Sequence, residues 1–300
     1  MGKAKVSVVK RLSEKGLIDP PPFVSGGTMY ETMMGSVAYG VSSDASDCDV
    51  YGFCMPPKDF VFPHLAGYVP GFSTQVPSFD QFQKHHIKEK DTRKEWDLQI
   101  YSIIKYFRLC MDNNPNMIDS LFTPDNMVLT RTKIANMVRD KRKIFLHKGS
   151  WHRFRGYAHS QLAKLKVKDP KPDSRRYEMV QQFGFDVKFA YHVVRLIDEV
   201  EQILEYGDID LQRDRERLKS IRKGEWSLED LQNWFKEKEK SMISLYENSK
   251  IPSYPPEEEI KQLLLECLEE RYGDLSRAVI NQDQATVALR QIAEIVRKVK

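Results

Sequence analysis

Residues 34–52 of this chain read Met-Gly-Ser-Val-Ala-Tyr-Gly-Val-Ser-Ser-Asp-Ala-Ser-Asp-Cys-Asp-Val-Tyr-Gly. The end of this segment has strand character, and side chains alternate along a strand, so Asp47 and Asp49 are expected on one face. Adjacent carboxylates repel each other, and Mg²⁺ with its oxygen ligands relieves such repulsion. Upstream, Gly35 and Ser36 open a short turn or helix whose free N–H groups can bind phosphate. A Ser- and Asp-rich turn is the competing interpretation, but the combined spacing predicts a phosphate-binding turn followed by a metal-binding strand.

This segment resembles the signature of polymerase-beta-type nucleotidyltransferases, which is Gly-Ser followed about eleven residues later by Ser-Asp-x-Asp. Five positions match it one by one: Gly35, Ser36, Ser46, Asp47 and Asp49. The chain is similar, more narrowly, to predicted nucleotidyltransferases found beside RNA ligases and in large phages. That likeness is carried by Gly-Ser-Val-Ala-Tyr-Gly at 35–40, Asp-Leu-Gln-Ile-Tyr-Ser at 97–102 and the segment 114–121.

One position departs from the family pattern. Many members place a basic residue three positions after the serine, where this chain has Tyr39. The resemblance therefore implies that other cations meet the charge of the triphosphate.

The resemblance implies a metal-dependent enzyme that moves a nucleoside monophosphate from an NTP, such as ATP, to an acceptor hydroxyl and releases pyrophosphate. Asp47 and Asp49 would hold Mg²⁺ or Mn²⁺, and Gly35, Ser36 and Ser46 would bind the nucleotide. The superfamily adds a third catalytic and metal-binding carboxylate. Asp97 is the candidate, because it alternates with apolar residues on the following strand; a solvent-facing aspartate on an edge strand is the alternative.

The remainder of the chain predicts an α+β fold. Most prolines lie within residues 20–125, between β-branched and aromatic runs typical of strands. We expect strands near residues 28–34, 48–55, 60–62, 82–88 and 95–101. Ser102 should cap a helix, Pro115 should open another, and helices should dominate from about Thr130. This predicts a mixed β-sheet nucleotidyltransferase domain (1–128) and a helical bundle (129–300) that closes the active-site cleft.

A predicted helix over residues 179–204 carries apolar side chains around most of its circumference and should be largely buried. Its exception is a polar stripe at helical spacing, formed by Lys188, His192, Arg195 and Glu199. Two interpretations stay open: Lys188, His192 and Arg195 bind the nucleotide, or the stripe is an internal salt-bridge network around Glu199.

The net charge of +4 does not by itself indicate a nucleic-acid-binding protein. Basic residues nevertheless cluster at 139–143 and 164–176, so an RNA end is the first choice of acceptor, ahead of a protein hydroxyl and a small molecule. A solvated surface is the competing interpretation of these clusters. No DNA specificity and no oligomeric state can be deduced.

No apolar run approaches the roughly 18 residues that a membrane-spanning helix needs. The N-terminus has no secretory h-region, and the four cysteines lack C-x-x-C spacing, so we expect a cytoplasmic protein without a membrane partner. A catalytically silent nucleotide-binding or partner-binding module on the same fold is the alternative function.

Overall fold

The computed structural model describes residues 6–42, 47–69, 78–92, 94–167 and 175–275, together with residues 292, 295 and 296. Its elements are, in chain order, α1 (Val8–Glu14), α2 (Pro22–Gly27), β1 (Thr28–Met33), α3 (Gly35–Ala38), β2 (Cys48–Cys54), α4 (Lys58–Val61), η1 (Pro63–Ala66), β3 (Gln81–Glu89), β4 (Lys94–Ser102), α5 (Ile103–Met111), α6 (Pro115–Phe122), η2 (Asp125–Met127), β5 (Val128–Arg131), α7 (Lys133–Asp140), η3 (Arg142–Phe145), α8 (Gly149–Val167), α9 (Arg175–Phe183), α10 (Val187–Tyr206), α11 (Arg215–Arg222), α12 (Leu228–Asn248) and α13 (Glu257–Tyr272).

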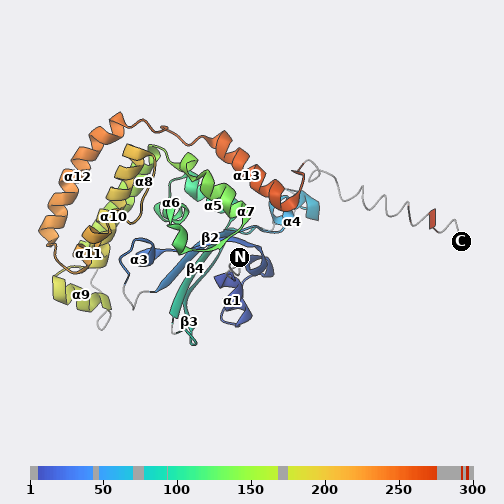
Figure 1. The fold of residues 1–300 in the computed structure, drawn as a ribbon, viewed down its shortest axis with the longest axis horizontal. Helices are drawn as coiled ribbons and strands as arrows, with labels where there is room; N and C mark the ends of the chain where they lie inside the picture. The colour runs from blue at the N-terminus through green and yellow to red at the C-terminus, as the bar shows by residue number, and fades with distance from the viewer. Residues whose placement is uncertain are drawn as a thin grey trace.

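Within these residues, five strands form one mixed sheet in the order β3-β4-β2-β1-β5. β2 and β4 run parallel, and the other neighbours pair antiparallel. One face of the sheet packs against the helices that follow it, through side chains such as Tyr30 and Phe53. The other face packs against α1 and α2 through Val50 and Leu98. Figure 1 shows the later helices arching over the sheet.

The predicted fold class is confirmed: a mixed sheet in the N-terminal part precedes a mostly helical C-terminal part. Four of the predicted strands correspond to β1, β2, β3 and β4. Ser102 caps α5, since its hydroxyl accepts a hydrogen bond from the Lys105 amide at 3.2 Å, and Pro115 opens α6. The division between residues 128 and 129 stays a prediction, and β5 lies across it.

Three predictions of secondary structure are wrong. Residues 60–62 are not a strand, because α4 covers most of them between Pro57 and Pro63, and proline cannot donate to a sheet ladder. The short strand β5 was missed; it pairs with β1 at the sheet edge. The single helix over 179–204 is instead α9 and α10, separated at Gly184, whose φ is +78°. The segment 169–173, whose two prolines predict a linker between helices, lies outside the described residues.

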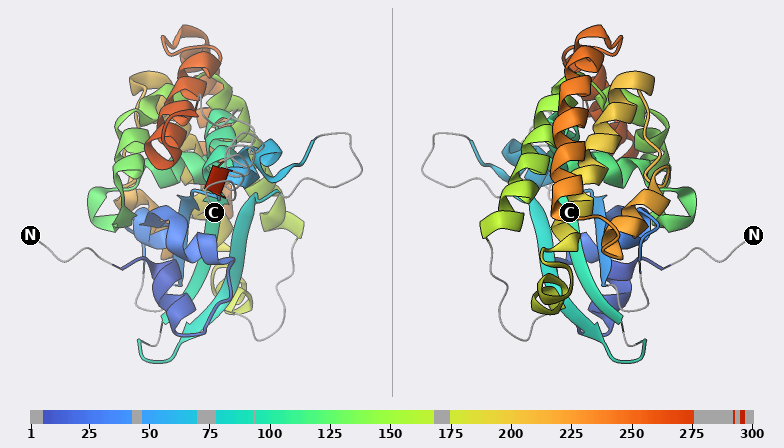
Figure 2. Two further views of the ribbon diagram at one scale, coloured as in Figure 1. Left: turned by 90° about the vertical axis from the view of Figure 1, so that its right-hand side faces the viewer. Right: turned by 90° about the vertical axis from the view of Figure 1, so that its left-hand side faces the viewer.

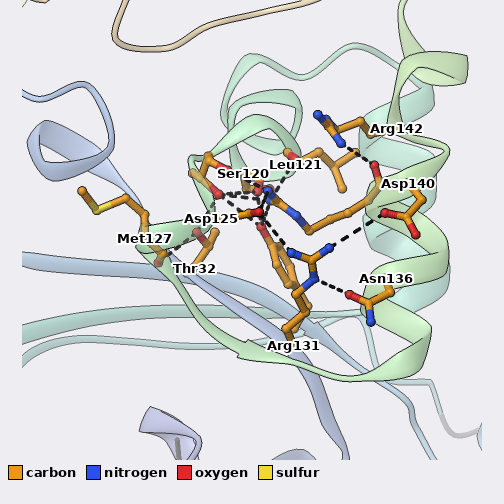
Figure 3. A network of polar contacts seen from close by, with 12 residues as sticks. Thr32, Ser120, Leu121, Asp125, Met127, Arg131, Asn136, Asp140 and Arg142 are labelled. Carbon is orange, nitrogen blue, oxygen red and sulfur yellow. Dashed lines mark hydrogen bonds and ion pairs between the residues drawn. The ribbon is translucent and has the colours of Figure 1, made fainter. Parts of the chain in front are cut away.

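The basic segment 139–143 makes contacts within the fold, and its RNA-binding role stays a prediction. Arg139 is buried and donates hydrogen bonds to the Tyr30 hydroxyl at 2.7 Å and to the Thr123 carbonyl at 2.8 Å. Figure 3 shows the surrounding network of polar contacts. Lys141 and Lys143 form ion pairs with acidic side chains of later segments, 3.2 and 2.6 Å long. Of the second basic segment, residues 168–174 lie outside the described ranges.

The β3–β4 hairpin is anchored to α1 by one buried carboxylate, Glu89. It pairs with Arg11, with Lys15 at 2.8 Å, with the Thr92 hydroxyl at 2.9 Å and with the Trp96 indole at 3.0 Å. Burial acts to raise the pKa of Glu89, but the hydrogen bonds outweigh it and hold the pKa at about 2. Figure 2 shows this hairpin, in teal, with α1 beside it.

Glu89→Gln is expected to cost about 1–3 kcal/mol of unfolding free energy at neutral pH. Because the folded pKa is lower than the ordinary value of 4.5, this stabilisation is complete above about pH 5 and is lost as the pH falls towards 2. Urea unfolding of wild type and variant between pH 7 and 2 measures the difference, which should shrink on acidification. The exposed Glu14→Gln is the control, and an equal pH dependence in both variants would contradict the prediction.

No described helix has both the length and the apolar character needed to cross a bilayer.

Candidate active site

A cavity of about 590 Å³ lies where the start of β2 and the α3 turn face α9, α10 and α11. The predicted site residues that line it are Gly35, Ser36, Asp47, Asp49, Lys188, His192 and Arg195. Ser46 lies outside the described residues. The structure thus brings together the motif and the polar stripe, which are separated by about 140 positions in the chain.

Gly35 allows the α3 turn to lie directly against Asp49. Its φ is +63°, a region that favours glycine, and α3 begins at this residue. A Cβ atom added here would lie 2.1 Å from Asp49 Oδ2. The neighbouring Met34 amide also donates to the Asp49 carbonyl at 2.8 Å. Both the backbone conformation and the available space therefore require glycine at position 35.

Gly35→Ala should lose about 2–3 kcal/mol of stability together with most of the nucleotidyl transfer that the motif predicts, because the methyl group displaces the Asp49 carboxylate. Gly16→Ala is the matched control, since Gly16 has a φ of +66° and nothing within 4 Å of an added Cβ. It should lose only the backbone part, about 1 kcal/mol. Urea unfolding and a transfer assay measure both effects. Equal losses of stability with unchanged transfer would show that Asp49 is not displaced.

Asp97 lies beside Asp49 on the neighbouring strand, as the alternation predicted. The parallel register pairs the two residues directly. Burial, followed by the negative charge of Asp97, raises the pKa of Asp49 to about 6, and the charge of Lys188 opposes this increase. Asp47 is more exposed, just before β2. The structure therefore places three acidic side chains near one another, and burial and like charge disfavour the ionised form of one of them, Asp49.

A β-bulge in the edge strand β3 positions two residues that contact the Asp97 carboxylate. The register of β3 and β4 shifts between Lys84 and Ile87, and His86 has a φ of +55°. In this conformation the His86 amide donates to Asp97 Oδ1 at 2.8 Å, and His85 Nδ1 lies 3.1 Å from Asp97 Oδ2. Asp97 is thus a partly covered, oriented carboxylate and not a free edge residue.

The part of the chain that the structure describes contains no group of three or more His, Cys, Asp or Glu side chains placed to hold a metal ion. Asp47, Asp49 and Asp97 therefore do not form a complete ligand cage by themselves. Mg²⁺ commonly binds through one or two carboxylates plus substrate phosphates. The repulsion between Asp49 and Asp97 fits a cation that arrives with a phosphate-bearing ligand.

Tyr39, the departure from the family pattern, lies under a cation from α10. Arg195 is buried, with its Cζ 4.3 Å from the centroid of the Tyr39 ring. The Tyr39 hydroxyl donates to Asp119 Oδ2 at 2.7 Å, and Arg195 pairs with that carboxylate and with Glu199 at 3.0 Å. A basic group thus lies beside the α3 turn, although it comes from a distant helix.

The polar stripe of α10 contains the internal ion network that one of the two interpretations predicted. Arg195 and Glu199 form the internal ion network, whereas Lys188 is exposed and His192 half-buried where they line the cavity. Arg195 also reaches the cavity, and among the described residues its buried Nε has no hydrogen-bond partner. The nucleotide-binding role of the stripe stays a prediction.

Sequence reasoning missed several lining residues. Tyr51 is two positions after Asp49 on the same face of β2, so the strand alternation could have identified it. Arg222 comes from α11, with its Cζ 5.4 Å from the Tyr191 ring centroid and a hydrogen bond to the Val41 carbonyl. No local pattern links Arg222 to the motif, because only tertiary packing brings α11 to the cavity.

Three comparisons of this chain with known proteins found similarities. A family model described as "RlaP: RNA repair pathway DNA polymerase beta family" matches residues 17–247. An uncharacterized 38.9 kDa protein of Enterobacteria phage T4, from the nrdC-mobD intergenic region, is 25% identical over 144 residues, which cover 47% of this chain and 39% of the phage protein. The alignment thus spans less than half of that relative.

A crystal structure of a nucleotidyltransferase-like protein from Exiguobacterium sibiricum aligns with 97% of this chain and 90% of its own at 11% identity. Its TM-score of 0.28 is too low to establish a shared fold.

Proposed function

Because this chain belongs to the RlaP family, the RNA repair pathway DNA polymerase beta family, we propose that it transfers a nucleoside monophosphate from an NTP to the 3′ hydroxyl of an RNA end. The match confirms the resemblance that the Gly-Ser and Asp-x-Asp motifs predicted. The observation that carries the proposal is the cavity itself, where Gly35, Ser36, Asp47 and Asp49 meet Lys188 and other cations. A triphosphate needs phosphate-binding amides, acidic metal ligands and cations within one space.

Asp47 and Asp49, with Asp97 beside them, would hold Mg²⁺ or Mn²⁺. When bound, the metal ions lower the pKa of the attacking hydroxyl and neutralise charge on the leaving pyrophosphate. The fit is supported by the raised pKa of Asp49, which burial and the charge of Asp97 bring to about 6.

The protein groups have separate tasks in this proposal. The backbone N–H groups at Gly35 and Ser36 bind phosphate oxygens, and Ser46 completes the motif. Asp97 orients the attacking hydroxyl and accepts its proton. His192 lies on the same wall as Lys188 and contacts the nucleotide.

Lys188 and Arg222 carry most of the stabilisation of charge on the pyrophosphate. Arg195 faces two carboxylates in its own network, so its positive charge is already offset. Its unpartnered Nε donates to the nucleotide, and its ring contact positions the Tyr39 turn. Lys188 and Arg222 are therefore the cations that meet the triphosphate charge in the absence of a basic residue at position 39.

The test incubates purified protein with Mg²⁺ or Mn²⁺ and each NTP, labelled at the α-phosphate that would be transferred. Two RNA oligonucleotides are offered as acceptors, one with a 3′ hydroxyl and one with a 3′ phosphate. Label should enter only the RNA with the free hydroxyl, because the phosphate blocks the nucleophile. Label on protein would replace RNA by a protein hydroxyl as acceptor. NTP binding without transfer to either would favour the silent binding module.

A further inference from the structure

The sheet face that carries Asp97 continues beyond the cavity as a polar row. Asp97, Gln99 and Tyr101 alternate on this face of β4, and the register pairs Gln99 with Gln83 and Tyr101 with Gln81. Gln81 and Gln83 are exposed, and the row ends at His85, 3.1 Å from Asp97. These side chains define what we name the glutamine row: Gln81, Gln83, His85 and Gln99.

The opposite face of the same strands has a different character. Phe82 packs there against the apolar cluster under α1 and α2, and Lys84 is paired in register with the buried Leu98. β3 is an edge strand of the described sheet, and its side chains Gln81, Gln83 and His85 are exposed. One face of the hairpin is thus committed to the core, and the other offers neutral amides next to the proposed catalytic carboxylate.

The start of α6 and the middle of α8 form a second wall near the row. Asn116 lines the cavity, and two positions earlier Asn114 donates from Nδ2 to the exposed Tyr157 hydroxyl at 3.1 Å. Tyr51, which is paired in register with Gln99, lines the same cavity as Asn116, so the contact between Asn114 and Tyr157 lies towards the Gln99 part of the row. An exposed aromatic ring therefore lies across from the amides.

Cations flank this ring on α8. Arg153 and Lys164 are four positions before and seven after Tyr157, which places all three on one side of the helix. All three are exposed. Lys164 Nζ lies 5.7 Å from the ring of Phe189, which directly follows the cavity residue Lys188 in the chain. The second wall thus combines one stacking surface with positive charge on both sides.

We propose that the 3′ end of single-stranded RNA lies between the glutamine row and Tyr157 and delivers its terminal hydroxyl to Asp97. This path rests on the proposed function and adds the route of the acceptor. Four residues of strand from Asp97 to Tyr101 span about 13 Å. The amides bind base edges and 2′ hydroxyls, Tyr157 stacks on an unpaired base, and Arg153 and Lys164 contact phosphates.

The test compares two variants of neighbouring residues on opposite faces of β3. Each variant makes the net charge of the protein one unit more negative. Gln83→Glu places a negative charge on the path and should weaken binding of single-stranded RNA about tenfold at low salt. Lys84→Gln removes a positive charge from the other face and should change affinity less than twofold. The converse variant Gln83→Lys should raise affinity and steepen the salt dependence by about 0.7 in the log–log slope.

Tyr157→Ala tests the second wall. Loss of one stacked base should weaken RNA binding by between about 5- and 100-fold. Tyr254→Ala is the control, since Tyr254 is 81% exposed on the segment between α12 and α13. NTP affinity and melting temperature should stay at the wild-type values in all five variants, which separates the path from the cavity and from folding.

The outcomes distinguish this path from the function on which it rests. If wild type labels RNA but Gln83→Glu and Lys84→Gln weaken binding equally, the path is overturned and the proposed function stands. If wild type binds NTP yet neither binds nor labels RNA, both are overturned. Weaker binding for Gln83→Glu and Tyr157→Ala, with unchanged controls, supports the path.

Discussion

Replacing Asp49 by asparagine is expected to lower nucleotidyl transfer by about 1,000-fold or more while the protein stays folded. Metal-assisted stabilisation of a transferring phosphoryl group contributes several kcal/mol, and each 1.36 kcal/mol corresponds to a factor of ten in rate. The amide has the shape of the carboxylate but carries no charge. Removing one of two carboxylates in direct register also relieves their repulsion, so the melting temperature without divalent metal should not fall.

Asp59→Asn is the control, because Asp59 is an exposed residue of α4 and the charge change is the same. The measurements are the transfer rate and the thermal shift caused by Mg²⁺ with NTP. Wild type and Asp59→Asn should both show the shift, and Asp49→Asn should lose it. Transfer within tenfold of wild type in Asp49→Asn would remove Asp49 from the proposed metal site.

Arg195→Met is expected to cause the largest loss of stability, about 3–5 kcal/mol. The substitution keeps the apolar stem of the side chain but leaves Asp119 and Glu199 as buried carboxylates without their cation. Charge without a partner in the protein interior costs far more than the pair itself contributes. Urea unfolding at neutral pH measures the loss.

A rescue variant identifies the cause of that loss. Asp119→Asn and Glu199→Gln in the Arg195→Met background remove all three charges, so most of the stability should return. If Arg195→Met unfolds at the wild-type urea concentration, the ion network makes no net contribution. If the triple variant is no more stable than the single one, packing and not charge accounts for the loss.

Local patterns were sufficient for the part of the fold that carries the motif. β1 and β2 have clear strand composition, and Ser102 and Pro115 are helix-start signals whose effect depends only on neighbouring backbone groups. For the same reason the placement of Asp47 and Asp49 followed from a period of two. These features are determined within a few residues, so the sequence alone could predict them.

Other features depend on contacts that no local pattern contains. β5 is a four-residue edge strand, too short for alternation to be recognised, and it is defined by its pairing with β1. The break before α10 carried readable signals, Gly184 and the capping residue Asp186, but apolar residues on both sides extended the helical pattern across it. Arg222 reaches the cavity through packing of α11 alone.

The ion pair between Asp119 and Arg195 also constrains the order in which the molecule can be completed during synthesis. The two residues are 76 positions apart, so at about 5–20 residues per second Arg195 is added about 4–15 s after Asp119. Throughout that interval the nascent chain holds a carboxylate that the core cannot enclose without its cation. The buried ion pair between α6 and α10 therefore forms only after α10 has left the ribosome, and a chain stalled before that helix leaves Asp119 without its cation.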